Sequence, residues 1–268
     1  MRSKIGYNGK RKREPRPALA KGGNHLFSGF TFDTIKFFLD IRFHNEKSFM
    51  QAHHAEYIRT IQEPFYAFIE AISPQMLKID PDFETRPYKC LARIYRDTRF
   101  TKDKSPYRDH LWLAFRKAAT PKDGLPFFWF EMGPEAVGWG VGIWGENREA
   151  MDAFRRRLAA RPDDFLFLPG LVQANGFALG GAEFKRLEVP PGLPDALRPL
   201  YVKREIYFGK MNTKMDWVYS PDIVTRVARD FKRLTPVYQL LTGCAEEALN
   251  ALEKASPATG PGAAFQHD

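Results

Sequence analysis

The residues best suited to chemistry lie in one run, residues 93–110, which reads Arg-Ile-Tyr-Arg-Asp-Thr-Arg-Phe-Thr-Lys-Asp-Lys-Ser-Pro-Tyr-Arg-Asp-His. Cationic side chains recur through this run, and the planar fork of arginine binds phosphate or carboxylate through two parallel hydrogen bonds. The run therefore predicts a site for an anion. The side chains expected to hold the ligand are Arg93, Arg96, Arg99, Lys102, Lys104 and Arg108.

The same run predicts a β-hairpin with a six-residue loop at residues 101–106, because polar and turn-forming residues separate two segments rich in strand formers. If Phe100 stands opposite Tyr107, Arg99 faces Arg108 on one side of the sheet. Two arginines directly opposite each other repel unless an anion lies between them. This register therefore supports the predicted anion site.

The register also places Asp97 across from His110. A carboxylate beside an imidazole orients the ring for proton transfer, so Asp97 and His110 are the candidate catalytic residues. A purely structural interpretation stays open. In it, Asp97, Asp103 and Asp109 neutralise the arginines and hold the loop, since buried arginine is tolerated when it is paired.

Three functions follow from this segment. The leading one is binding of an anionic ligand, such as a phosphorylated metabolite or a phosphate backbone. The first alternative is an acid–base enzyme in which His110, oriented by Asp97, removes a proton while arginines hold the anion of the substrate. The second is a protein–protein adaptor whose arginine-rich face meets an acidic partner.

The segment resembles, almost letter for letter, the signature of the domain of unknown function 2461 family, found mainly in bacteria. The usual form in that family is Arg-Ile-x-Arg-Asp-x-Arg-Phe-Ser-Lys-Asp-Lys-Thr-Pro-Tyr-Lys. Weaker similarities cover most of the body, at Asn45, Phe49, Tyr57, Gly138, Gly140, Trp144, Glu183, Lys185 and Arg186. The sequence departs from the family at His44, which replaces one residue of a usual Asn-Asn pair, and at Ser48, where a Trp is customary. The resemblance implies no particular reaction.

Motifs of several enzyme classes are missing: there is no His-Glu-x-x-His, no Walker loop and no Gly-x-Ser-x-Gly. Cys90 and Cys244 are widely separated and are interpreted as free thiols. We therefore expect no metal, no cofactor and no covalent nucleophile. The glycines of residues 138–142 alternate within an expected strand, so their face is predicted to let a helix or another backbone pack closely, the alternative being a ligand on that face.

Patterning predicts an α+β fold, in which an antiparallel β-sheet meander is covered by N-terminal and C-terminal helices. Apolar residues at helical spacing predict helices near residues 32–39, 45–50, 58–72, 147–158, 220–234 and 237–252. Aromatic and β-branched segments predict strands at residues 89–100, 107–116, 126–132, 136–144, 177–189 and 203–210. Residues 165–182 are interpreted as loop and short strand. Asn45 is expected to cap the second helix and Asn147 to open a later one.

The net charge of +9 comes mainly from the N-terminus. Residues 1–24 hold eight Lys and Arg and one acidic residue, and are predicted to be a disordered basic tail. A single α+β domain is expected at residues 25–255 and a second disordered tail at 256–268. Nucleic acid is expected to bind, if at all, through the basic tail. The absence of a recognisable signal peptide or membrane span predicts a soluble, cytoplasmic protein without a membrane partner.

Overall fold

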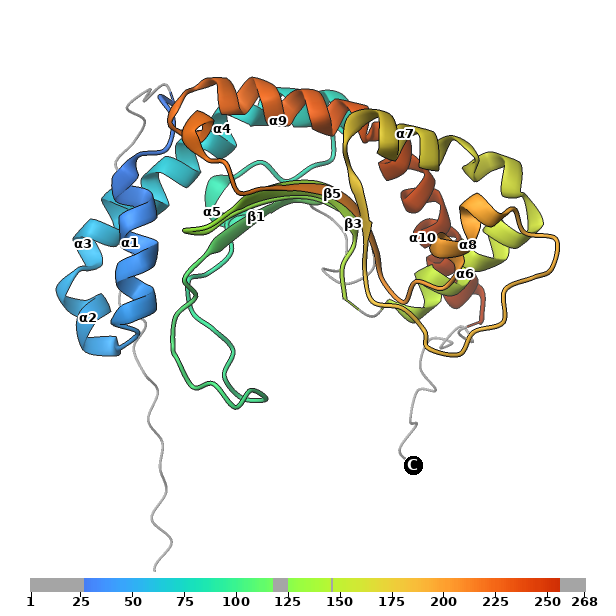
Figure 1. Cartoon of the computed structure of the whole chain (residues 1–268), viewed down its shortest axis with the longest axis horizontal. Coiled ribbons are helices and arrows are strands. Elements are labelled where there is room, and N and C mark those ends of the chain that lie inside the picture. The colour runs from blue at the N-terminus through green and yellow to red at the C-terminus, as the bar shows by residue number, and fades with distance from the viewer. Residues whose placement is uncertain (1–26, 118–124, 146, 256–268) are drawn as a thin grey trace, which may run out of the picture.

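The computed structural model describes residues 27–117, 125–145 and 147–255, so both predicted tails lie outside the described residues. Its centre is a five-stranded antiparallel sheet in the order β1-β2-β3-β5-β4 (Figure 1). The strands are β1 (Leu111–Phe115), β2 (Phe127–Met132), β3 (Val137–Ile143), β4 (Ala178–Gly180) and β5 (Ile206–Asn212). Helices precede and follow the sheet in sequence, and further helices lie between β3 and β5; the combination confirms the predicted α+β class.

The N-terminal helices form one end of the molecule and continue over the convex face of the sheet (Figure 1). They are α1 (Phe32–Phe43), α2 (Lys47–Ala52), α3 (His54–Tyr57), a π-helical turn η1 (Ile58–Gln62), α4 (Glu63–Ile79) and α5 (Pro87–Cys90). Pro64 does not break the long helix. Proline lacks a backbone N–H, and the wider π-helical turn just before it absorbs the change in hydrogen bonding.

The C-terminal helices pack at the other end and also over the convex face (Figure 1). They are α6 (Arg148–Ala160), η2 (Pro162–Phe165), α7 (Phe167–Asn175), η3 (Asp195–Leu197), α8 (Arg198–Tyr201), η4 (Asp216–Tyr219), α9 (Asp222–Arg233) and α10 (Thr235–Ala255). Asn147 caps α6 as predicted, with its Oδ1 accepting from the Ala150 N–H at 3.0 Å. The expected loop at residues 165–182 was wrong in part, because residues 167–175 form α7 and only the end is strand. None of the described helices combines the length and apolar character needed to cross a bilayer.

The core lies between the convex face of the sheet and the helices. Phe130 on β2 packs against Phe68 with ring centroids 4.6 Å apart, and stacks on Phe30 at 6.0 Å. On β3, the buried indole of Trp139 donates from Nε1 to Oδ2 of Asp230 on α9 at 3.1 Å. Period-two alternation in the strands therefore sends one set of side chains into the helix layer.

The opposite, concave face of the sheet carries the glycines of β3. A Cβ added to Gly140 would lie 2.2 Å from the backbone oxygen of Phe208 and 2.7 Å from Cα of Gly209, both on β5. A Cβ on Gly209 would in turn lie 2.8 Å from Cζ2 of Trp129. This confirms the predicted close packing. The absent side chains let the sheet bend into the arch seen in Figure 1 and let an indole lie against it.

Candidate functional site

Residues 92–110, here called the arm, leave the sheet as a long hairpin that extends below its concave side (Figure 1). Only isolated bridges join its two sides, and Tyr95, not Phe100, stands opposite Tyr107. The predicted register was therefore wrong, and so was the predicted strand at residues 89–100, whose start belongs to α5. Phe100, expected in a core-like position, is 91% exposed near the tip.

The register differs because side chains compete with strand pairing inside the loop. Oδ1 of Asp103 accepts from the Ser105 N–H at 2.9 Å, and Oδ1 of Asp97 accepts from the Arg99 N–H at 3.2 Å. Such carboxylate-to-backbone bonds close local turns and remove donors from a ladder. The loop consequently widens well beyond the six residues expected.

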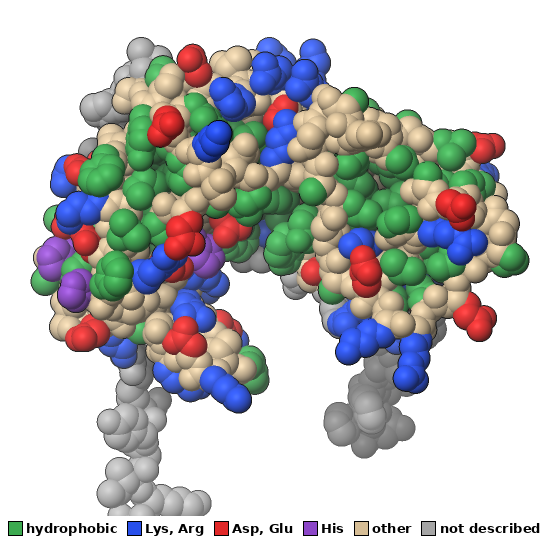
Figure 2. All heavy atoms as spheres, viewed as in Figure 1, with side chains coloured by type: hydrophobic (Ala, Val, Ile, Leu, Met, Phe, Trp, Pro, Cys, Tyr) green, Lys and Arg blue, Asp and Glu red, His purple; other side chains and the backbone are tan. Residues whose placement is uncertain are grey.

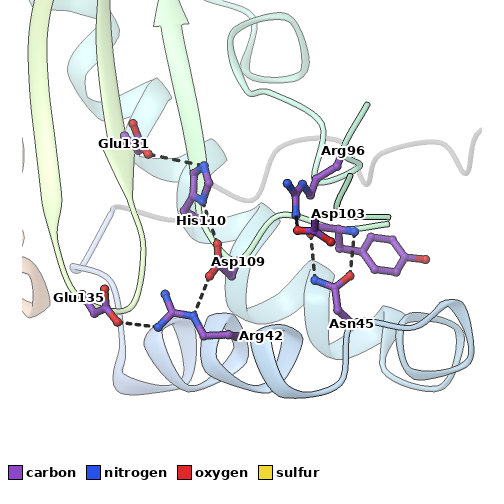
Figure 3. Close-up of polar contacts among 9 residues, drawn as sticks. Arg42, Asn45, Arg96, Asp103, Asp109, His110, Glu131 and Glu135 are labelled. Atoms are coloured by element: carbon purple, nitrogen blue, oxygen red, sulfur yellow. Dashed lines mark hydrogen bonds and ion pairs between the residues drawn. The ribbon is translucent and has the colours of Figure 1, made fainter. Parts of the chain in front are cut away.

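Asn45 anchors the base of the arm from the helical end of the molecule (Figure 3). Its amide donates from Nδ2 to the Tyr107 carbonyl at 3.0 Å and accepts from the Tyr107 N–H at 2.9 Å. The prediction that Asn45 caps α2 was wrong, because the residue before that helix is Glu46. Asn45 is thus a positioning residue for the arm.

Two of the predicted ligand-binding arginines are already neutralised by carboxylates of the arm. Arg96 pairs with Asp103, and Nη2 of Arg99 lies 2.6 Å from Oδ2 of Asp97. The hydrogen bond from Arg99 lowers the pKa of Asp97 to about 2. Arg99 therefore does not face Arg108, and for these two arginines the structural interpretation describes the geometry well.

The two lysines of the arm lie near its tip. Nζ of Lys104 donates to the Thr98 carbonyl at 2.8 Å, and Lys102 is exposed. Neither lysine is among the residues that line the cavity bordered by Arg93, Arg96, Arg99 and Arg108. The structure therefore does not bring Lys102 and Lys104 to the predicted clamp, because the wider loop carries them away from the sheet.

Arg93 and Arg108 differ from the paired arginines. Within the described residues, no carboxylate lies at ion-pair distance from either guanidinium. Arg108 is half-buried and donates from Nη1 to the carbonyls of Arg93 and Tyr95, at 2.7 and 2.8 Å. Burial, followed by repulsion from Arg96 and Arg93, lowers the pKa of Arg108. Two carbonyl oxygens and the attraction of Asp97 offset part of its charge, but among the described residues no carboxylate contacts it.

These guanidinium groups border a cavity of about 680 Å³ between the arm, α5 and β1. Its cationic lining residues are Lys89, Arg93, Arg96, Arg99, Arg108 and Arg116, and Asp97 is the acidic residue among them. We call this space the cationic cavity. Four of the six predicted ligand-binding residues meet there, although in a different arrangement from the predicted one.

His110 lies at the end of the arm, where β1 begins, and its partner is Asp109 (Figure 3). Nδ1 of His110 is 3.0 Å from Oδ1 of Asp109, and its Nε2 is 3.7 Å from Oε1 of Glu131. Asp97 forms its ion pair with Arg99 instead. The predicted pairing of Asp97 with His110 was therefore wrong, because it depended on the hairpin register.

Asp109 is itself held by a residue of α1. Nε of Arg42 lies 2.7 Å from Oδ2 of Asp109, and Nη1 of Arg42 lies 2.6 Å from Oε1 of Glu135 (Figure 3). Burial raises the pKa of Asp109, but the hydrogen bonds from His110 and Arg42 outweigh burial and leave that pKa below its usual value. Asp109 is thus a charged carboxylate, and its contact with Nδ1 orients the imidazole of His110.

Beside His110 opens a second cavity, of about 460 Å³, which we call the aromatic cavity. It is lined by His110, Trp112, Arg116, Phe127, Trp129, Glu131 and Trp144. Trp112 and Arg116 line both cavities, so the two cavities are adjacent, and together we call them the cleft. Figure 2 shows the molecule hollowed beneath the sheet, between the arm and the C-terminal helices.

Arg116 occupies the junction of the cleft. Its guanidinium carbon lies 4.1 Å from the ring centroid of Phe127 and 5.6 Å from that of Trp112. Sequence reasoning did not single out Arg116 or Trp129. The signal was present, since Trp112 and Ala114 on β1 and Phe127 and Trp129 on β2 recur at period two on the face away from the helices.

The cysteines lie apart from this chemistry. Cys90 and Cys244 are buried and free, as predicted. Burial raises the pKa of the Cys90 thiol to about 12 and that of Cys244 to about 11, so both stay protonated near neutrality. Among the described residues, no group of three or more His, Cys, Asp or Glu side chains is arranged to hold a metal ion.

Fold and site together define an α+β protein with a ligand-sized cleft beneath a bent antiparallel sheet. A sequence model of the family described as conserved hypothetical protein (DUF2461) matches residues 33–240. The chain belongs to that family, as its resemblance predicted, and the match spans the arm and the sheet. A search of curated proteins finds no match to the chain.

Proposed function

We propose that this protein binds a small anionic ligand, bearing a phosphate or a carboxylate, in the cationic cavity. The observation that carries this proposal is Arg108, a half-buried guanidinium without a carboxylate partner in the described structure. Its repulsion by Arg96 and Arg93 is a cost that a bound anion would relieve. The side chains proposed to contact the ligand are Arg93, Arg108 and Arg116.

The concave shape of the cleft favours a small ligand over a protein partner. An adaptor surface is typically flat and buries several hundred square ångströms on each side. The two half-open cavities of the cleft instead have volumes of about 680 and 460 Å³, within the range of small-molecule sites. The adaptor interpretation therefore ranks below ligand binding.

The test compares the thermal melt of the full chain in phosphate, sulfate and pyrophosphate with its melt in chloride at matched ionic strength. A ligand that binds only the folded state stabilises it by mass action. At 10 mM anion and a Kd of about 1 mM, the melting temperature should rise by about 3–6 °C. Matched ionic strength separates a site from general screening.

Arg93→Gln is the informative variant, because this exposed side chain has no carboxylate partner whose loss would itself destabilise the fold. We expect it to reduce the response to anions while leaving the melt in chloride unchanged or slightly higher, because it removes part of the repulsion of Arg108. Arg229→Gln removes an exposed arginine from α9, over the convex face, and serves as the matched control. The proposal is wrong if all three anions act like chloride, or if both variants respond like the parent.

A second candidate function is acid–base catalysis by His110, favoured by the 3.0 Å contact between its Nδ1 and Asp109. The imidazole lines the aromatic cavity, next to the cations that would hold a substrate anion. We expect hydrolysis of p-nitrophenyl phosphate to be lost in His110→Gln and reduced in Asp109→Asn. His54→Gln, a change at an exposed histidine on α3, should leave it intact. An inactive parent, or an active His110→Gln, would refute this function.

We also infer a cytoplasmic location, because two free, buried thiols suit a reducing compartment. Affinity for nucleic acid is proposed to reside in residues 1–24, which carry most of the net charge. Deletion of residues 1–24 should remove most binding to a duplex and leave the melt unchanged. Undiminished affinity with the same salt dependence in the deletion variant would contradict this.

A further inference from the structure

One wall of the aromatic cavity consists of tryptophan side chains, one of which is largely exposed to solvent. Trp144 is 55% exposed, although its ring stacks on Tyr207 with centroids 4.6 Å apart and an interplanar angle of 26°. Trp129, only 8% exposed, lies 6.3 Å from Trp144 and lies against the glycine face of the sheet. The wall therefore offers indole surface to a ligand, backed by packing that holds the rings in place.

Aromatic and cationic surfaces meet within one cleft. Arg116 is held on the faces of Phe127 and Trp112, and both Arg116 and Trp112 also line the cationic cavity. A molecule that spans the junction would place an apolar, flat portion on the tryptophans and an anionic portion among the arginines. Charge complementarity therefore orients the ligand along the cleft.

The ionisable side chains of the aromatic cavity are His110, Glu131 and Arg116, and the buried Nε1 of Trp129 is a further donor, without a hydrogen-bond partner among the described residues. His110 and Glu131 lie at one end, with Nε2 and Oε1 3.7 Å apart, and the other lining side chains are aromatic apart from Arg116. A sugar ring placed against the tryptophans, with a hydroxyl on nearly every carbon, would need more polar partners than this wall provides. A flat ring with a few heteroatoms matches a stacking surface whose polar groups are the His110–Glu131 pair and the indole N–H of Trp129.

We propose that the anionic ligand carries a heteroaromatic ring, as a nucleoside monophosphate or flavin mononucleotide does. This inference rests on the proposed function, since the arginines bind the phosphate. The ring stacks on Trp144 and Trp112, and its heteroatoms reach His110 and Glu131. The phosphate lies beside Arg116 and Arg108.

Isothermal titration calorimetry on the full chain tests this with AMP, GMP, UMP and flavin mononucleotide as ring-bearing probes. Ribose 5-phosphate, which has the anion without the ring, is the reference. Stacking of a base on an aromatic side chain contributes about 5- to 150-fold in affinity. We expect at least one ring-bearing probe to bind about tenfold or more tightly than ribose 5-phosphate.

Trp144→Ala removes an exposed ring and should preserve the fold. It is expected to cancel most of the advantage of the ring-bearing probe while leaving the Kd of ribose 5-phosphate unchanged. Trp144→Phe keeps a stacking surface and should restore most of that advantage. Tyr219→Ala, at an exposed aromatic residue of η4, is the matched control and should bind like the parent.

The outcomes separate this inference from the proposed function. Suppose that ribose 5-phosphate binds and loses affinity in Arg93→Gln, but that no ring-bearing probe binds more tightly. The proposal of a heteroaromatic ring is then wrong, and the proposal of an anion site is supported. If Trp144→Ala loses affinity equally for both kinds of probe, the proposal of a heteroaromatic ring is also refuted. If neither kind of probe binds, both proposals fail.

Discussion

Gly140 lies where β3 and β5 come closest on the concave face, so Gly140→Ala tests how the sheet forms the cleft. The added Cβ would lie 2.2 Å from the oxygen and 3.0 Å from the carbon of the Phe208 carbonyl, and 2.7 Å from Cα of Gly209. A carbon and an oxygen ordinarily approach to about 3.3 Å. One strand must therefore shift by roughly 1 Å, and backbone cannot rotate aside as a flexible side chain does.

The expected cost follows from that shift. Overpacking typically destabilises by about 1–3 kcal/mol, and three backbone atoms inside normal contact place Gly140→Ala at the upper end of that range. For a domain of this size, about 3 kcal/mol corresponds to a melting temperature lower by roughly 6–12 °C. Thermal unfolding followed by circular dichroism measures this, and urea unfolding gives the free energy directly.

Gly170→Ala is the matched control. Gly170 lies inside α7, and a Cβ there would meet nothing within 4 Å. Because glycine in a helix interior is worse than alanine by about 0.5–1 kcal/mol, this variant should melt slightly higher than the parent. If Gly140→Ala melts within 2 °C of the parent, the close approach of β3 and β5 does not constrain the sheet and this reasoning fails.

Three further tests concern buried Asp230, the ion pair of Glu84 with Arg86, and Asn45 at the base of the arm. Asp230→Asn should lower the free energy of unfolding in urea by about 3–5 kcal/mol, because buried Asp230 pairs with Lys210 at 2.8 Å. Adding Lys210→Met to the Asp230→Asn chain should recover part of that loss. An unchanged free energy of unfolding in Asp230→Asn would contradict this. Arg86 lowers the pKa of Glu84 to about 2, so ionised Glu84 stabilises the fold above its unfolded pKa of about 4.3 and this contribution disappears as the pH falls through 2. Glu84→Gln should accordingly flatten the dependence of the unfolding free energy between pH 4.5 and 2, and an unchanged slope refutes the pairing. Asn45→Ala should cost about 1–3 kcal/mol and speed amide hydrogen exchange in the arm, whereas unchanged exchange would show that Asn45 does not anchor it.

Strands β1, β2 and β3 were predictable because their signal is local, whereas only residues 178–180 of the strand predicted at 177–189 form one. In residues 137–143, Val137, Trp139 and Val141 alternate with glycines, and the structure buries those three side chains toward the helices. The start of α6 at Asn147 was equally predictable, since a cap acts on backbone N–H groups only a few residues away. Period-two alternation and capping do not depend on the rest of the molecule.

The composition of the cleft was only partly predictable. The arm was recognisable as a cationic segment, and Arg93, Arg96, Arg99 and Arg108 do meet in one cavity. The structural interpretation predicted that aspartates of the arm neutralise arginines, but not which aspartate each arginine meets, because that choice depends on the turn geometry. Aromatic residues from different strands form the second cavity only after the sheet has paired and bent.

The chain sequence determines which side chains are available, their alternation along each strand and the family to which the protein belongs, because these are properties of neighbouring residues. Only folding determines which partner each charged group meets. His110 pairs with Asp109 and not with Asp97, since carboxylate-to-backbone bonds widen the loop and Asn45 holds Tyr107 from a helix far away in sequence. A shift of register costs nothing in local propensity, yet it changes every cross-strand contact, so tertiary contacts select one register and thereby define the site.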